Sequence, residues 1–133
     1  MKEMILLILS LFTGTLAYLV PNFWMKPILR YLDIRHEVTA DLVFYANVLH
    51  ETIIGDELKK RAKERRVSNR KHASEFVACY YRLPFWYKWI LRLRKESPLD
   101  ASSALIGLSN SSNDTYAVHE RRLRSALRVG DTP

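Results

Sequence analysis

The stretch MILLILSLFTGTLAYLVPNFWM, residues 4–25, contains no charged side chain and opens with a run of leucine and isoleucine. Its 22 residues would form a helix about 33 Å long, which matches a hydrocarbon core of about 30 Å. Trp24 lies where an aromatic belt forms at a membrane surface, and Lys26 can extend its amine from just beyond that belt. The pattern predicts a transmembrane anchor over residues 1–25.

A cleaved signal peptide is the main alternative for this stretch, and a buried core helix is the other. Thr15-Leu16-Ala17 loosely resembles a cleavage site. However, Lys2 and Glu3 nearly balance each other before the apolar run, and the run continues beyond Ala17. We therefore favour an uncleaved span.

Positive charge is concentrated after the apolar stretch. Lys26, Arg30 and Arg35 follow it within ten residues, and residues 56–96 carry 13 Lys/Arg against 5 Asp/Glu. By the positive-inside rule, the N-terminus is expected outside and the basic body in the cytoplasm. The sequence thus predicts a single-pass protein of the bacterial inner membrane, with the body on its cytoplasmic face.

The rest of the chain shows helical rather than strand periodicity, so we predict an all-α fold. The expected domain is a basic helical bundle over residues 26–129, followed by a tail at 130–133. Thr39 and Asp100 are expected to cap helices, and residues 54–56 to form a turn. The expected helices are 28–34, 40–51, 57–82, 85–95, 101–108 and 116–129.

The segment 85–95 combines aromatic and basic residues in a helical pattern. Phe85, Trp86 and Trp89 fall on one side, together with Ile90 and Leu93, whereas Lys88, Arg92 and Lys95 fall on the other. A helix of this length is too short to span a bilayer, but it can lie along the surface with its aromatic side in lipid. Packing of the tryptophans in the bundle core is the alternative, and the two are compatible.

A second basic segment occupies residues 59–71. Anionic lipid, a protein partner and nucleic acid are all possible contacts, and a solvated helix face is the simplest alternative. No recognisable nucleic-acid-binding motif accompanies the charge, which weakens the nucleic-acid interpretation. The cations are Lys59, Lys60, Arg61, Lys63, Arg65, Arg66, Arg70 and Lys71.

Enzymatic signatures are not apparent in the sequence. The four histidines are scattered, without a close metal-ligand pattern, and no phosphate-binding glycine loop occurs. Cys79 is expected to be a small buried hydrophobe rather than a nucleophile. We expect no catalytic residues, no metal and no cofactor. Asp33, Glu37 and Asp41 are explained by capping and by ion pairs with Arg30 and Arg35.

Two short motifs, DLVFYANV at 41–48 and LIGLSNS at 105–111, resemble a group of bacterial and prophage-borne single-span membrane proteins with helical bodies. The likeness covers roughly residues 23–128. It implies the same architecture but no particular activity.

Within these motifs, Tyr45, Asn47, Ser109 and Asn110 are candidates for an interaction surface, with a buried polar network as the favoured alternative. Gly107 is expected to permit close helix approach.

Small prophage membrane proteins include superinfection-exclusion proteins, which hinder entry of a competing phage's DNA. This analogy makes superinfection exclusion the most specific expectation. The predicted function is non-enzymatic, through contacts with lipid and with an inner-membrane or envelope-transiting protein. A membrane-tethered nucleic-acid-binding protein that uses the basic helix 57–72 is the alternative.

Overall fold

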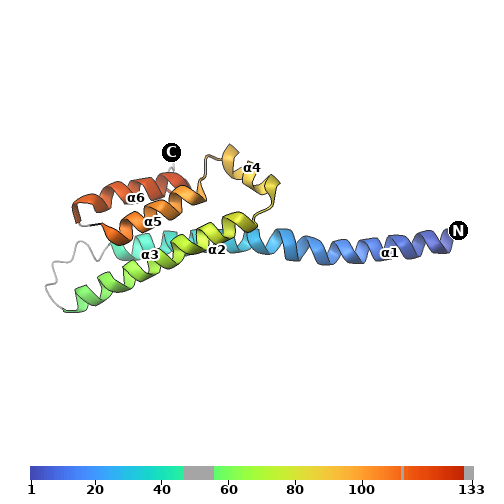
Figure 1. Ribbon diagram of the computed structural model, residues 1–133, viewed down its shortest axis with the longest axis horizontal. Coiled ribbons are helices and arrows are strands. Elements are labelled where there is room, and N and C mark those ends of the chain that lie inside the picture. The colour runs from blue at the N-terminus through green and yellow to red at the C-terminus, as the bar shows by residue number, and fades with distance from the viewer. Residues whose placement is uncertain (47–55, 112, 131–133) are drawn as a thin grey trace.

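The computed structural model describes residues 1–46, 56–111 and 113–130, without the side chains of residues 46, 58, 113 and 114. Asn47, the end of the predicted helix 40–51, the Ile54–Gly55 turn and tail residues 131–133 lie outside the described residues. Every regular element within the described ranges is a helix, which confirms the all-α class (Figure 1).

The N-terminal third is one continuous helical rod made of α1 (Lys2–Leu19), η1 (Val20–Met25) and α2 (Lys26–Ala46). All residues of α1 are exposed, and this is the one helix among the described residues that is long and apolar enough to cross a membrane. Pro21 does not end the rod. The helix widens locally to π geometry, in which the Lys26 amide donates to the Pro21 carbonyl.

The prediction of two separate helices, 28–34 and 40–51, is wrong because α2 is unbroken from Lys26 to Ala46. The Thr39 hydroxyl donates to the Arg35 carbonyl at 2.8 Å, one turn back within the helix, so it does not cap a new one. One face of α2 enters the core through Tyr31, Ile34, Val38 and Leu42, which recur every three or four residues.

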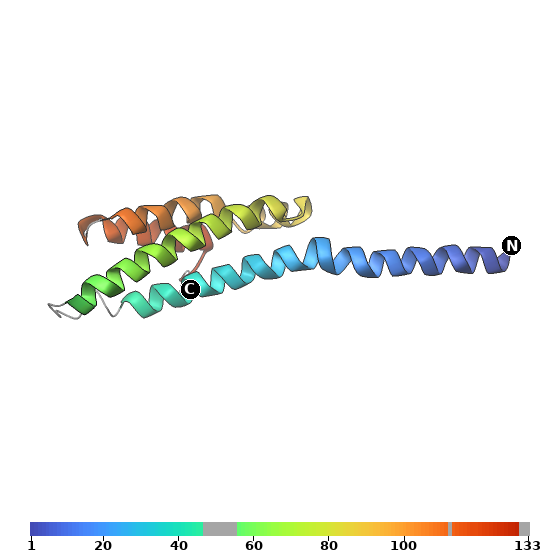
Figure 2. The same ribbon diagram turned by 60° about the horizontal axis from the view of Figure 1, so that its bottom comes forward.

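Four helices form the bundle. α3 (Asp56–Arg82) runs antiparallel to α2, and α5 (Pro98–Asn110) and α6 (Asn113–Leu127) complete it (Figures 1 and 2). The short α4 (Phe85–Leu93) lies at the end of the bundle nearest α1. The first half of α3 is largely exposed and its second half is packed, as predicted. The members of the hydrophobic core beyond α2 are Ala73, Phe76, Cys79, Leu83, Leu91, Ala101, Ala104, Leu105, Leu108, Tyr116, Leu123, Ala126 and Leu127.

The predicted cap of the fifth helix is also wrong. α5 begins at Pro98 rather than at residue 101, and its N-cap is Ser97 rather than Asp100. The Ser97 hydroxyl accepts a hydrogen bond from the backbone amide of Asp100 at 3.3 Å. Serine at the N-cap followed by proline at the first helical position is a favourable combination, because proline has no amide left to satisfy. The neighbouring predictions erred only at their ends, since α4 ends at Leu93 and α6 begins at Asn113.

Gly107 permits α5 and α6 to approach closely, as predicted. A Cβ added there would clash with Nδ1 and the adjoining atoms of the His119 ring. Alanine in a helix interior is normally more stable than glycine by about 1 kcal/mol. In the native background we expect Gly107→Ala to give no such increase in stability, because the His119 imidazole must move aside.

The steric conflict is testable in a double-mutant cycle. With His119→Ala already present, Gly107→Ala should stabilise the protein by about 1 kcal/mol. The measurement is urea unfolding of the four proteins in mild detergent. Equal effects of Gly107→Ala in both backgrounds would show that the imidazole does not limit the site.

Candidate functional site

The most exposed apolar surface of the body lies on α4. Phe85, Trp89 and Leu93 recur every four residues and are 85%, 61% and 63% exposed. Side chains at this spacing share one helix face. A soluble protein rarely leaves such a stripe uncovered, so this face is suited to lipid or to a partner.

The opposite face of α4 attaches the helix to the bundle. Leu91 is buried, and Tyr87 packs edge-on against Tyr31 with ring centroids 6.2 Å apart. Trp86 is half-buried beside Tyr87, whereas Trp89 points away from the core. The alternative that both tryptophans fill the core is therefore wrong for Trp89, because Leu91 occupies that role.

The predicted interfacial cations of α4 differ in their surroundings. Arg92 is exposed, and Lys88 is half-buried with its ammonium 5.0 Å from the centre of the Tyr80 ring. On the rod, Trp24 is exposed and lines an apolar hollow with Leu16, Leu19, Val20 and Phe23. The Lys26 amine contacts the Asn22 side chain. The exposed aromatic groups of η1 and α4 thus occur at the same end of the bundle (Figure 1).

The basic segment 59–71 starts at the opposite end. α3 runs from the far end of the bundle towards α1, so its cation-rich first half is the part most distant from the apolar rod (Figures 1 and 2). From Arg61 to Arg82 the helix axis extends about 30 Å. The basic surface on the first half of α3 and the aromatic face of α4 are therefore well separated.

Two of the eight cations are engaged within the protein. The Arg65 guanidinium lies 4.8 Å from the centre of the Tyr116 ring, and Arg70 donates to Asn110 Oδ1 at 3.0 Å. Lys59 lies 3.9 Å from Asp56 in a fully exposed pair. The other five, which are all exposed, are Lys60, Arg61, Lys63, Arg66 and Lys71.

The candidate interaction motif divides into two places. Ser109 and Asn110 meet Arg70 at the end of α5, and the Ser109 hydroxyl also donates to the Ile106 carbonyl at 2.8 Å. Tyr45 is half-buried and lines a small cavity between α2, α3, α5 and α6. Ser109 is buried, whereas the Arg70–Asn110 hydrogen bond lies on the exposed surface, so an interaction role for the motifs stays a prediction.

A buried carboxylate joins the elements around α4. The Glu96 side chain is 1% exposed, accepts a hydrogen bond from the Tyr31 hydroxyl at 3.0 Å, and lies 3.0 Å from Arg94 Nε and 3.8 Å from Arg35. The Arg94 contact is an ion pair without hydrogen-bond geometry. Burial, and next the Glu96 charge, raise the pKa of the Tyr31 hydroxyl.

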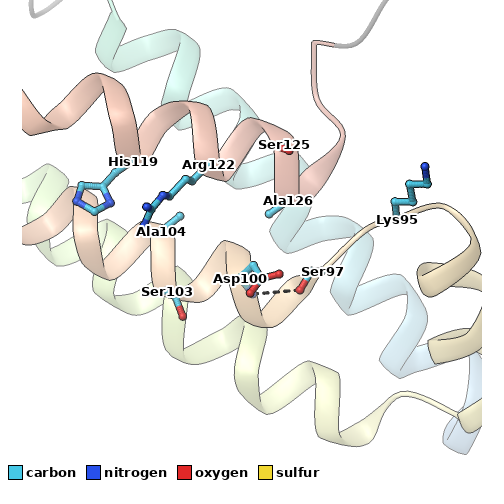
Figure 3. Close-up of a pocket in the computed structure, with 9 residues that line it drawn as sticks. All are labelled: Lys95, Ser97, Asp100, Ser103, Ala104, His119, Arg122, Ser125 and Ala126. Carbon is cyan, nitrogen blue, oxygen red and sulfur yellow. Dashed lines mark hydrogen bonds between the residues drawn. The ribbon is translucent and has the colours of Figure 1, made fainter.

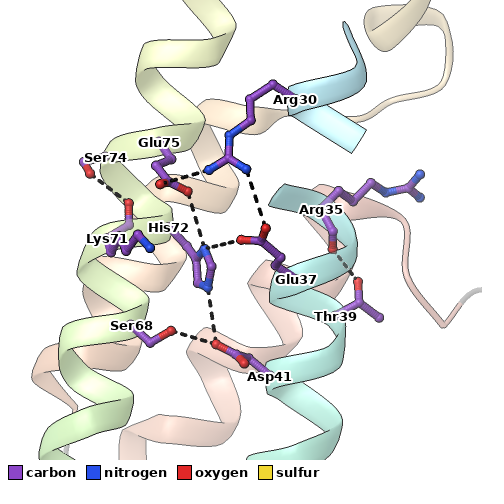
Figure 4. Close-up of polar contacts among 10 residues, drawn as sticks. All are labelled: Arg30, Arg35, Glu37, Thr39, Asp41, Ser68, Lys71, His72, Ser74 and Glu75. Atoms are coloured by element: carbon purple, nitrogen blue, oxygen red, sulfur yellow. Dashed lines mark hydrogen bonds and ion pairs between the residues drawn. The ribbon is translucent and has the colours of Figure 1, made fainter. Parts of the chain in front are cut away.

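A second cluster lies between α2 and α3, around His72 (Figure 4). His72 Nε2 lies 3.3 Å from Asp41 Oδ2, and Nδ1 lies 3.7 Å from Glu37 Oε2 and 3.8 Å from Glu75 Oε2. Arg30 pairs with the other oxygen of both glutamates, at 3.5 Å for Glu37 and 3.1 Å for Glu75.

Sequence reasoning missed this cluster because it treated the histidines one at a time. Two spacings carry the signal. His72 and Glu75 are three residues apart on α3, and Glu37 and Asp41 are four apart on α2, so each pair shares a helix face. The predicted Arg30–Glu37 pair forms, whereas Asp41 accepts a hydrogen bond from Ser68 at 2.7 Å instead of pairing with an arginine of its own helix.

A surface groove of about 490 Å³ runs between α5 and α6 (Figure 3). Arg122 reaches across it towards α5 (Figure 3). Serine and alanine side chains line the groove together with four ionisable residues, Lys95, Asp100, His119 and Arg122. Cys79 does not line it: the thiol is buried, and burial raises its pKa, which disfavours the reactive thiolate.

The fold and these clusters can be compared with known proteins. No family model, no curated protein and no solved structure matches the chain. The resemblance to prophage-borne membrane proteins therefore stays a prediction.

Proposed function

We propose that this protein is a membrane-anchored interaction protein without a catalytic reaction of its own. α1 would span the inner membrane, and the α2–α6 bundle would lie on the cytoplasmic face. The observation that carries the proposal is the pairing of two uncovered apolar surfaces at one end of the bundle, the whole of α1 and the Phe85–Trp89–Leu93 face of α4.

The position of α4 supports a second membrane contact. A span in α1 would place the interface near η1, where Trp24 is exposed, and α4 lies at that end of the bundle (Figure 1). An amphipathic helix at this level can place its aromatic face in the headgroup region while its cations meet phosphates. Two contacts would hold the bundle at a fixed angle to the bilayer and define which surface a protein partner meets.

Fluorescence quenching tests this arrangement with the full chain in liposomes. In the Trp24→Phe, Trp86→Phe double variant, Trp89 is the sole tryptophan. We expect brominated lipids to quench its emission strongly, because the indole would lie among acyl chains and headgroups.

The matched control removes Trp89 as well and places one tryptophan at the exposed Val67 in the first half of α3. This site would lie too far from the bilayer for quenching. Equal, weak quenching at both positions, with helicity preserved by circular dichroism, would exclude docking of α4 on the membrane.

The basic end of α3 favours a second candidate function, binding of a soluble anionic partner such as nucleic acid. Its distance of about 30 Å from the membrane-proximal end exceeds the Debye length of about 8 Å, so lipid headgroups beneath α4 would barely attract it. DNA titration against the protein in neutral nanodiscs tests this. If the protein binds nucleic acid here, its affinity for DNA should fall steeply as the salt concentration rises, and the Lys60→Glu, Lys63→Glu double variant should not bind.

The biological role we favour is phage superinfection exclusion, which depends on the resemblance of the two motifs and on the membrane anchor. Expression in a sensitive host should lower plating efficiency for phages that inject DNA across the inner membrane. Adsorption should remain unchanged, because the proposed action follows attachment.

A further inference from the structure

We propose that Glu37, His72 and Glu75 bind a divalent transition-metal ion, for which Zn²⁺ is the best fit, between α2 and α3. One ligand atom from each side chain lies within 4.8 Å of the other two. Imidazole nitrogen and carboxylate oxygen are both ligands that zinc accepts. This inference is independent of the proposed function.

The ligand spacing is close to what such an ion requires. His72 Nδ1 lies 3.7 Å from Glu37 Oε2 and 3.8 Å from Glu75 Oε2. Ligands about 2.0 to 2.1 Å from a tetrahedral ion lie about 3.4 Å apart. Closing the two His72 contacts thus needs movements of a few tenths of an ångström, and the two glutamate oxygens, which lie within 4.8 Å of each other, must approach to the same spacing. A fourth position stays open for water.

Two unsatisfied atoms point to a missing ligand. His72 Nδ1 and Glu75 Oε2 are both buried and have no hydrogen-bond partner, and the His72 side chain is only 7% exposed. Buried polar atoms are normally paired, because taking such an atom out of water without giving it a partner is unfavourable. A cation between them would satisfy both, whereas a proton on Nδ1 leaves both carboxylates beyond hydrogen-bond distance.

The surrounding residues are arranged as supports for metal ligands (Figure 4). Asp41 faces Nε2 of His72 at 3.3 Å, and a carboxylate there holds the proton on Nε2 and turns the Nδ1 lone pair towards the glutamates. Arg30 contacts the outer oxygens of Glu37 and Glu75, so their inner oxygens remain directed at His72.

The local charge also favours a divalent cation. Three carboxylates, from Glu37, Asp41 and Glu75, surround His72, and within the part of the chain that the structure describes Arg30 is the one Lys or Arg paired with them. A bound Zn²⁺ would neutralise the remaining negative charge. Since its ligands come from both α2 and α3, it would fasten the membrane-side rod to the bundle.

Metal titration of the full chain in mild detergent tests the site. After treatment with a chelator, we expect the protein to take up one equivalent of Zn²⁺, and Co²⁺ to give visible absorption bands at the same stoichiometry. His72→Ala should weaken binding at least 100-fold. Asp41→Asn, which changes only a support, should weaken it about 10- to 100-fold.

His119→Ala is the matched control, because it removes another histidine of the bundle and should leave affinity unchanged. Glu75→Gln preserves size and serves if His72→Ala does not fold. Absence of stoichiometric uptake, or equal affinity in the His72→Ala or Glu75→Gln protein and in the His119→Ala protein, would overturn the proposal.

Discussion

Replacing Leu11 and Leu16 with arginine should release the protein from the membrane fraction. Both side chains are exposed on α1 and lie in the inner part of the uncharged stretch 4–25. Arginine near the centre of a spanning helix costs about 2.5–3.5 kcal/mol per residue. The eleven Leu, Ile, Phe and Val residues of the stretch contribute about −0.3 to −0.6 kcal/mol each at best, so two arginines offset most or all of that gain.

Alkaline carbonate extraction followed by immunoblotting measures the result. The native protein should stay in the pellet, and the double variant should appear in the supernatant or be degraded. Val67→Arg, at an exposed site in the basic half of α3, controls for added charge and should stay in the pellet. A native protein that extracts fully, or a mature chain that begins after Ala17, would refute the anchor.

Replacing Glu96 with alanine should cause the largest loss of stability from a single polar substitution. The carboxylate is almost fully buried and lies against Tyr31, Arg35 and Arg94. Its removal would leave the Tyr31 hydroxyl unpaired and the Arg35 charge without its counter-ion. Breaking one side of a buried pair costs about 3–5 kcal/mol, and the partial exposure of Arg94 favours the lower end.

The control for this substitution is Glu120→Ala. Glu120 pairs with Arg124 at 2.8 Å on the same helix, but both side chains are partly exposed, so the expected loss is about 0.5 kcal/mol. Urea unfolding in mild detergent gives the free energy of unfolding for each protein. Glu96→Gln should fall between the two, because the amide still accepts from Tyr31. Similar losses for Glu96→Ala and Glu120→Ala would disprove the role of the buried carboxylate.

Much of the helical architecture is predictable from local pattern. The apolar stretch, α3 and α4 follow from an uncharged run or from helical periodicity, and the structure places the ends of α3 and α4 within a few residues of the prediction. The helix starts that were predicted wrongly occur where one polar side chain can make either of two hydrogen bonds or where two neighbouring residues can both act as the cap. Thr39 can cap a helix or bond back within one, and Ser97 competes with Asp100 as a cap, so only the surrounding packing selects between them.

The candidate surfaces show the same division. The sequence predicts which face of the 85–95 segment is aromatic, but not that Leu91 faces the core while Trp89 faces away. It also predicts a basic segment at 59–71, but not that Arg65 lies against the Tyr116 ring and that Arg70 donates to Asn110.

By itself, the sequence determined the apolar span, the all-helical class and the position of the basic block. These are sums over consecutive residues, and hydropathy and helical periodicity need no knowledge of distant partners. Only the tertiary structure decided the Glu96 and His72 clusters and the placement of α4 at the end of the bundle nearest α1. Tyr31 and Glu96 are 65 residues apart, and Asp41 and His72 are 31 apart. Their meeting depends on how the helices pack, because a local pattern specifies a helix face but not the side chain that faces it.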